Sequence, residues 1–223
     1  MGDKRGYYMG IIPVELYQDR EDGKLAVGVR TNGPATLQDL LDAWQPLCDD
    51  ASIYKQYAPD NYSVCRGCKI NCCNTAYVMP DLIAVRKMAE YLKTDYRSLM
   101  ERYMQMDKTE AGVLQMQLPC AFLKEGICSI YPVRSLICRF YICTDILGAT
   151  QQLIYSITMT GITAAAVWAE KEGLVQSMSN RGQSSFDLLL QRLLNEYRSH
   201  EQVKLFLEAE NYSDIPLQPF LNP

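Results

Sequence analysis

The spacing of the cysteines constrains this 223-residue chain more than any other feature. Eight of its nine cysteines fall into two groups of four. The first group is Cys65-x2-Cys68-x3-Cys72-Cys73, and the second is Cys120-x7-Cys128-x9-Cys138-x4-Cys143. Two cysteines separated by two residues can turn both sulfurs toward one ion, because the loop between them reverses the chain. Two groups of four thiols therefore predict metal binding.

Disulfide bonds are the alternative use of so many cysteines, and three features weigh against them. The number is odd, Cys72 and Cys73 are adjacent, and neither an apolar segment nor a small-residue cleavage site follows the first residues. Dense cysteines in a reducing compartment more often serve metal or redox chemistry. We therefore expect a cytoplasmic protein with its cysteines as thiols.

The adjacent pair Cys72-Cys73 limits how the thiols can be shared. Successive side chains point to opposite sides of an extended segment and diverge by about 100° on a helix. Two neighbours therefore do not easily bind the same metal atom. They could serve two centres, bind different irons of one cluster, or include a spare thiol. Cys48 lies outside both groups, and we expect it to be a buried structural residue.

Four cations lie within a few residues of the clustered cysteines: Arg66, Lys69, Arg134 and Arg139. A four-thiolate zinc or an oxidised four-iron cluster carries a charge of roughly −2, which is costly to bury alone. These side chains could offset that charge and donate hydrogen bonds to sulfur. Each of them is also compatible with an ordinary place on the surface.

The pattern of the remaining residues predicts a mostly helical α+β domain with an N-terminal β-hairpin and a cysteine-rich metal-binding core. The hairpin spans 7–34, with its turn at Asp22-Gly23, and Thr36 opens a helix with Asp39 in its first turn. Further expected elements are helices over 81–93 and after Asp95, a strand over 113–118, a hairpin over 122–131, helices from 147 to 208 and an extended tail from 215.

Three regions follow from this pattern. They are an N-terminal hairpin at 1–34, a cysteine-cluster metal-binding region at 35–147 and a C-terminal helical region at 148–223, together expected to form one compact domain. No charge occurs between Asp145 and Glu170. This stretch also contains several glutamine, serine and threonine residues, so it favours a buried core helix over a membrane span.

Charge and the other reactive residues exclude several functions. The net charge is −4 and no stretch is strongly basic, so we expect no nucleic-acid partner. His200 is the only histidine and lies far from the cysteines in the sequence. No Ser-His-Asp or Cys-His set can be built without it, and we assign no catalytic residue.

The run from Pro119 to Tyr141 resembles the YkgJ-type cysteine-cluster family, the zinc- or iron-chelating CxxCxxCC domain. The shared features are Pro-Cys-x-Phe-Leu, Cys-x-Ile-Tyr and Cys-Arg-x-Tyr, and the resemblance covers residues 65 to about 143. Two departures are an extra residue between Cys68 and Cys72, and Ser135 where the family has proline. The resemblance implies a metal site formed by Cys65, Cys68, Cys72, Cys73, Cys120, Cys128, Cys138 and Cys143.

Three classes of function remain open. We favour an iron–sulfur protein with one or two clusters of the 4Fe-4S type, which transfers electrons or assists another enzyme through a redox or client protein. We favour iron over zinc because adjacent cysteines and the irregular second spacing do not resemble paired zinc knuckles. A structural zinc-binding interaction protein is the alternative. The third class is similar to flagellin lysine N-methylase, which shares the cysteine domain, but the chain has no glycine-rich loop for a methyl donor.

Overall fold

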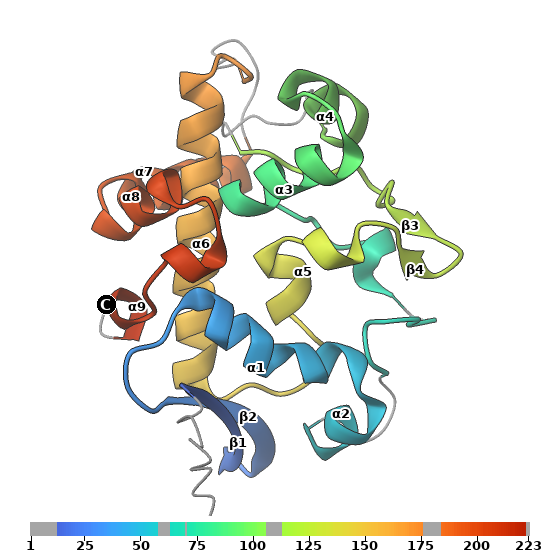
Figure 1. Ribbon diagram of the computed structural model, residues 1–223, viewed down its shortest axis with the longest axis vertical. Coiled ribbons are helices and arrows are strands. Elements are labelled where there is room, and N and C mark those ends of the chain that lie inside the picture. The colour runs from blue at the N-terminus through green and yellow to red at the C-terminus, as the bar shows by residue number, and fades with distance from the viewer. Residues whose placement is uncertain (1–12, 58–62, 70, 106–112, 176–183, 222–223) are drawn as a thin grey trace, which may run out of the picture.

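The computed structural model describes residues 13–57, 63–69, 71–105, 113–175 and 184–221. Helices dominate and the strands form two small antiparallel hairpins, which confirms the predicted α+β class (Figure 1). The elements are β1 (Val14–Glu21), β2 (Lys24–Thr31), α1 (Leu37–Asp49), α2 (Ala51–Tyr57), α3 (Leu82–Leu92), α4 (Tyr96–Tyr103), β3 (Leu123–Lys124), β4 (Ile127–Cys128), α5 (Leu136–Phe140), α6 (Gly148–Lys171), α7 (Ser185–Arg198), α8 (Glu201–Glu208) and α9 (Gln218–Leu221).

The long helix α6 is the centre of the fold. It packs against five other helices, α3, α5, α7, α8 and α9. Most of its residues are buried, and they lie on all sides of the helix. By length and composition alone α6 could also cross a membrane, but 78% of its most apolar 18-residue window is buried inside the protein. The prediction of a buried core helix in the uncharged stretch is therefore confirmed.

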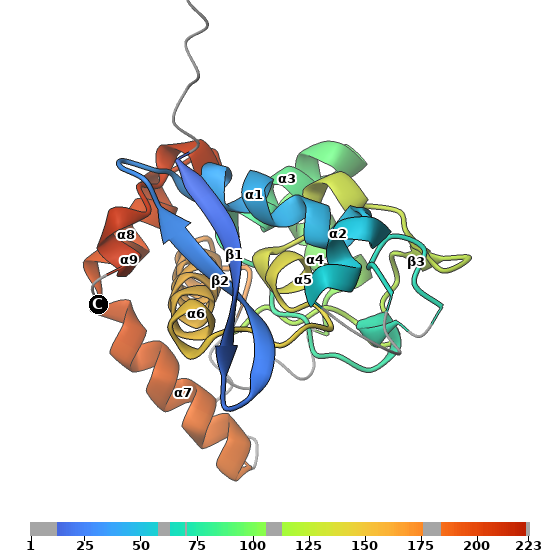
Figure 2. The same ribbon diagram turned by 90° about the horizontal axis from the view of Figure 1, so that it is seen from below.

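The N-terminal hairpin lies across one end of α6 (Figure 2). Its register runs from Val14↔Thr31 to Glu21↔Lys24, and both residues of the predicted Asp22-Gly23 turn have positive φ, as a type I′ turn requires. Residues 7–12 of the expected hairpin lie outside the described residues. Two backbone hydrogen bonds of Val27, to Asp145 and from Leu147, attach the hairpin to the segment that enters α6.

Helix α1 begins as the sequence predicts. Thr36 and Asp39 form a capping box, in which the Thr36 hydroxyl accepts from the Asp39 amide at 3.2 Å and the Asp39 carboxylate accepts from the Thr36 amide at 2.8 Å. The helix buries an apolar face that ends at Cys48, which is fully buried as expected. The short helix α2 that follows was not among the expected elements.

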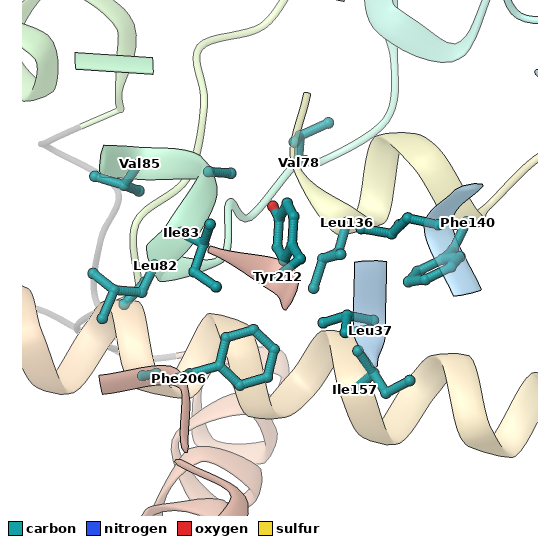
Figure 3. Packing of buried hydrophobic residues seen from close by; sticks show 14 of the residues in the cluster. Leu37, Val78, Leu82, Ile83, Val85, Leu136, Phe140, Ile157, Phe206 and Tyr212 are labelled. Carbon is teal, nitrogen blue, oxygen red and sulfur yellow. The ribbon is translucent and has the colours of Figure 1, made fainter. Parts of the chain in front are cut away.

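One buried carboxylate joins three segments of the core. Asp81 caps α3 by accepting from the Ala84 amide at 3.0 Å, and it also accepts from the Leu136 amide at the start of α5 at 2.9 Å. The Tyr212 hydroxyl donates to the same carboxylate at 3.0 Å. Figure 3 shows Tyr212 among apolar side chains of α3 and α5, above α6. The C-terminal region therefore completes the core around the cysteine-bearing segments.

Two expected extended segments differ in the structure. Residues 113–118 form only an isolated bridge between Met104 and Met116, because the amides of Met116 and Gln117 bond to different neighbours, Val78 and Tyr103. The tail from 215 contains the short helix α9 rather than an extended chain. Pro219 is the second residue of that helix, where a missing amide proton costs nothing.

Gly161 should be the glycine of α6 least tolerant of a side chain. A β-carbon there would lie 2.7 Å from Asp81 Cβ and 3.0 Å from a ring carbon of Phe206. Gly161→Ala should therefore lower the free energy of unfolding by about 1–3 kcal/mol, measured by chemical denaturation. Gly148→Ala, whose β-carbon would lie no closer than 3.4 Å to Glu21, is the matched control and should stay within about 0.5 kcal/mol. Equal effects would contradict the close α6–α3 contact.

Candidate metal centre

Apart from Cys138 in α5, the clustered cysteines lie on short segments between the helices, on the side of the molecule away from α7, α8 and α9 (Figures 1 and 2). Cys65 and Cys68 occupy a loop, and Cys72 and Cys73 a single 3-10 turn. In the second group, Cys120 precedes β3, Cys128 ends β4 and Cys138 lies within α5. Cys143 follows α5 in the segment that leads to α6.

The local turns have the residues that their geometry requires. The Cys68 amide donates to the Cys65 carbonyl at 3.3 Å, and Gly67 between them has a φ of +78°. The chain reversal predicted between these cysteines is therefore present. The predicted hairpin at 122–131 is also confirmed, with Glu125 and Gly126 at its turn and Cys128 paired with Leu123.

Backbone contacts bring the two groups together. The Cys120 amide donates to the Cys73 carbonyl at 2.9 Å, and the Tyr54 hydroxyl of α2 donates to the Cys143 carbonyl at 2.8 Å. All nine cysteines are thiols, without disulfides. The fold thus joins segments about 50 residues apart, and ordering that loop has an entropic cost that a shared metal would help to offset.

A cavity of about 300 Å³ lies between the two groups. Six of the eight clustered cysteines line it: Cys65, Cys72, Cys73, Cys120, Cys128 and Cys138. Cys68 and Cys143 are not among its lining residues. Apolar side chains such as Val78, Met88 and Ile130 complete much of the wall. The structure therefore gathers sulfur donors from both groups around one apolar space.

The thiols are spaced more widely than a single ion requires. Within the described residues, no three cysteine, histidine or acidic side chains come close enough together to hold one metal ion. Zinc–thiolate bonds are about 2.3 Å long, so a lone zinc would need the sulfurs to move inward.

Arg134 is the cation that the structure places at the cavity wall. It is only 6% exposed, and its guanidinium lies 3.5 Å from the centre of the Tyr131 ring. Its Nε donates to the Tyr131 carbonyl at 3.1 Å and its Nη1 to the Cys138 carbonyl at 3.5 Å. Its positive charge favours the thiolate forms of Cys65, Cys128 and Cys138. This position suits a charge that offsets bound thiolates.

The other three cations lie farther out. Arg139 is half-buried and donates to the Gln45 side chain at 3.2 Å. Arg66 and Lys69 are exposed beside the first group, and the Arg66 guanidinium lies 5.8 Å from the centre of the Tyr131 ring. These positions leave Arg66 and Lys69 available at the surface.

Hydrogen bonds and burial make the thiols unequal. Burial raises the pKa of Cys138 to about 12, although the Ser135 hydroxyl, 3.5 Å from its sulfur, acts in the opposite direction. A hydrogen bond from Cys73 lowers the pKa of Cys72 to about 6. The same hydrogen bond raises the pKa of Cys73, so without metal Cys72 carries negative charge more readily than Cys73.

Three residues of the site were not predicted. Ser135, noted in the sequence only as a departure from a family proline, supplies a hydroxyl to Cys138 that proline could not. Tyr131 lines the cavity and stacks with Arg134. The buried Asn71 side-chain oxygen lacks a hydrogen-bond partner among the described residues and belongs to a cavity-lining residue. Ser135 and Tyr131 had a signal in the sequence, as a departure from the family pattern and as part of its Cys-x-Ile-Tyr motif, whereas Asn71 had none.

Cys48 lies next to the site although the sequence separates it from both groups. The Arg66 amide donates to the Cys48 carbonyl at 3.2 Å, and the Cys48 thiol donates to the Arg139 carbonyl at 3.4 Å. A hydrogen bond between the thiols of Cys48 and Cys65 lowers the pKa of Cys48 and raises that of Cys65. Burial of Cys48 was predicted, but this contact was not.

Neighbouring thiols offer a sharp test of the ligand set. Cys48→Ala should keep its full metal content, because the Cys48 thiol donates to the Arg139 carbonyl and is not a metal ligand. Loss of this buried thiol should lower the free energy of unfolding by about 1 kcal/mol. Cys65→Ala should lose metal, because it removes a cavity thiol. Metal analysis of the two purified variants compares them directly. Metal loss from the Cys48 variant would make Cys48 a ligand and overturn this assignment.

One comparison with known proteins finds a match for the cysteine-bearing part of the chain. Residues 64–158 match the family model CxxCxxCC, described as "Putative zinc- or iron-chelating domain". No curated protein and no solved structure matches the chain. The matched stretch contains every clustered cysteine, the cavity between them and the start of α6. This part of the chain, which is less than half of its length, is therefore similar to the CxxCxxCC family of zinc- or iron-chelating domains.

Proposed function

We propose that this chain is an iron–sulfur protein that exchanges electrons with a protein partner or assists another enzyme. The observation that carries the proposal is the cavity of about 300 Å³ lined by six cysteines. It lies within the stretch that matches the model of a metal-chelating domain family. The protein would supply the thiolate ligands, the buried Arg134 and the apolar walls, and the cluster would supply the redox chemistry.

The choice of iron over zinc rests on the spacing of the donors. Thiolate ligands suit both metals. A structural zinc site has four donors drawn around one ion, whereas an iron–sulfur cluster holds its thiolates apart with inorganic iron and sulfide. Six thiols that line one open cavity of about 300 Å³ favour the cluster. A zinc-binding interaction protein is the second candidate, because the family description includes zinc equally.

The surface beside the first cysteine group supports exchange with a partner. Cys72 and Cys143 are exposed, so part of the site lies close to solvent. Arg66 and Lys69 are exposed on the same segment as Cys72. Positive charges around a redox centre would steer an acidic partner into contact. We therefore propose an acidic redox protein or client enzyme as the partner, in the cytoplasm.

A lysine N-methylase-like activity has less support. The cavity beside the cysteines has a volume that a methyl donor could occupy, but the cysteines themselves line it. A metal group and a methyl donor would then compete for one space. Methyl transfer would then need a binding site for the methyl donor elsewhere in this protein or on a partner protein.

The metal itself is the first test. Protein purified without oxygen should be brown, contain iron with a comparable amount of acid-labile sulfide, and lose its visible absorption on addition of dithionite. Elemental analysis, sulfide determination and an optical spectrum measure these properties together. A colourless protein with stoichiometric zinc and no sulfide would replace the cluster with the zinc alternative.

Metal removal should destabilise the fold. The centre would link segments about 50 residues apart, so metal affinity appears as folding free energy. We expect the metal-free protein to unfold or aggregate, or to lose at least about 3 kcal/mol, which is roughly 6–12 °C in Tm. Thermal unfolding before and after anaerobic chelation measures this change. Protein reconstituted with iron and sulfide is the control and should regain its original Tm, whereas an unchanged Tm without metal would contradict the linkage.

A further inference from the structure

We infer that a second, smaller pocket, which shares only Arg134 with the cysteine cavity, binds a phosphate group. This pocket has a volume of about 150 Å³ and lies where α1, α3 and α5 meet the segment near the C-terminus. Its lining residues are Gln38 of α1, Lys87 of α3, residues 132–134, Arg139 of α5 and Tyr212. The inference does not depend on which metal the cysteines bind.

The lining of this pocket is positively charged. It contains three cations, Lys87, Arg134 and Arg139, and no acidic residue. Within the described residues none of the three forms an ion pair. Arg134 is buried and the other two are half-buried, so solvent screens their charges less than it would at an exposed site. Like charges around one small space repel each other, and an anion bound between them would relieve that repulsion.

Each of the three cations keeps N–H groups that it can offer to a ligand. Nε and Nη1 of Arg134 donate to backbone carbonyls, but its Nη2 has no acceptor in the described part of the chain. Arg139 uses Nη2 for the Gln45 side chain, and Lys87 Nζ donates to the Asn211 side chain at 3.0 Å. Their other N–H groups have no acceptor among the same residues. Arginine and lysine donors of this kind form strong, charge-assisted hydrogen bonds with phosphate oxygens.

The neutral polar groups of the pocket already have protein partners. The Gln38 side-chain amide donates to Asp42 at 2.7 Å, and the Tyr212 hydroxyl donates to Asp81 at 3.0 Å. Neither carboxylate lines the pocket. Lys87 Nζ lies 5.8 Å from the centre of the Tyr212 ring, which favours a place for the ammonium group at the pocket wall. The free donors therefore come from the cations, so the pocket suits an anion better than a neutral ligand.

The size of the pocket and the number of its cations favour phosphate over other anions. A volume of 150 Å³ is about the space of five water molecules at ~30 Å³ each. Inorganic phosphate has five heavy atoms, whereas a nucleotide is several times larger. A phosphate group offers at least three acceptor oxygens, one for each cation, and a carboxylate offers two. The ligand is therefore inorganic phosphate or the phosphate group of a small phosphomonoester.

Calorimetric titration with inorganic phosphate tests the pocket in the metal-loaded wild-type protein at constant ionic strength. Lys87→Gln should weaken phosphate binding about tenfold, because it removes one charge-assisted donor, and should leave the Tm unchanged. Lys204→Gln removes the same charge from an exposed position of α8 outside the pocket, so it is the matched control and should bind as the wild type does. Equal affinity of the Lys87→Gln variant and the wild type would overturn the assignment.

Competing ligands define what the pocket holds. Sulfate resembles phosphate in shape and charge but is the weaker metal ligand, so its competition with phosphate would support the pocket over the metal centre as the binding site. Displacement of inorganic phosphate by glycerol phosphate would support a phosphorylated small molecule as the ligand, and failure to displace it would support the free ion. Phosphate that binds no better than chloride, or that binds only while it extracts metal, would overturn the proposal. Metal analysis before and after the titration measures that extraction.

Discussion

The buried carboxylate of Asp81 joins the first turn of α3, the first turn of α5 and the Tyr212 hydroxyl near the C-terminus. Burial raises the pKa of Asp81, and these three hydrogen bonds act in the opposite direction. A buried carboxyl group without partners would cost several kcal/mol, so the segments that supply its donors must come together. Because α5 carries Cys138 and is preceded by Arg134 and Ser135, this contact also positions one wall of the cysteine cavity.

The helices around Asp81 provide a rigid side for a site that otherwise consists of loops. Gly161 lets α6 approach the N-terminal end of α3, and the hairpin is attached to the segment that leads from Cys143 into α6. The opposite side of the cavity is formed by the loop and 3-10 turn of the first cysteine group. Short loops held between packed elements can adjust their sulfurs when metal binds, while α5 keeps Cys138 of the second group in place.

The electrostatic arrangement separates two tasks among the four cations near the cysteines. Arg134 is buried against Tyr131 and its charge reaches the thiols, so it suits stabilisation of a negatively charged centre. Arg66 and Lys69 are exposed, so solvent screens their effect on the thiols and they suit recognition of a partner. Arg139 has an intermediate place, bonded to Gln45 of α1. Under the proposed function, burial would therefore assign stabilisation of the centre to Arg134 and recognition of a partner to Arg66 and Lys69.

The sequence by itself determined the features that depend on a few neighbouring residues. They include the capping box at Thr36, the turns at Asp22-Gly23 and Glu125-Gly126, the reversal at Gly67 and the buried helix α6. The spacing of the cysteines also indicated metal chelation, in agreement with the family match. Only the tertiary structure decided that Asp81 joins α3 to α5, that Cys48 contacts Cys65, and that Cys73 lies against Cys120. Turns and caps depend on contacts three or four residues apart, which a short pattern specifies. Contacts between segments about 50 residues apart depend on how the whole core packs, and no local pattern contains that information.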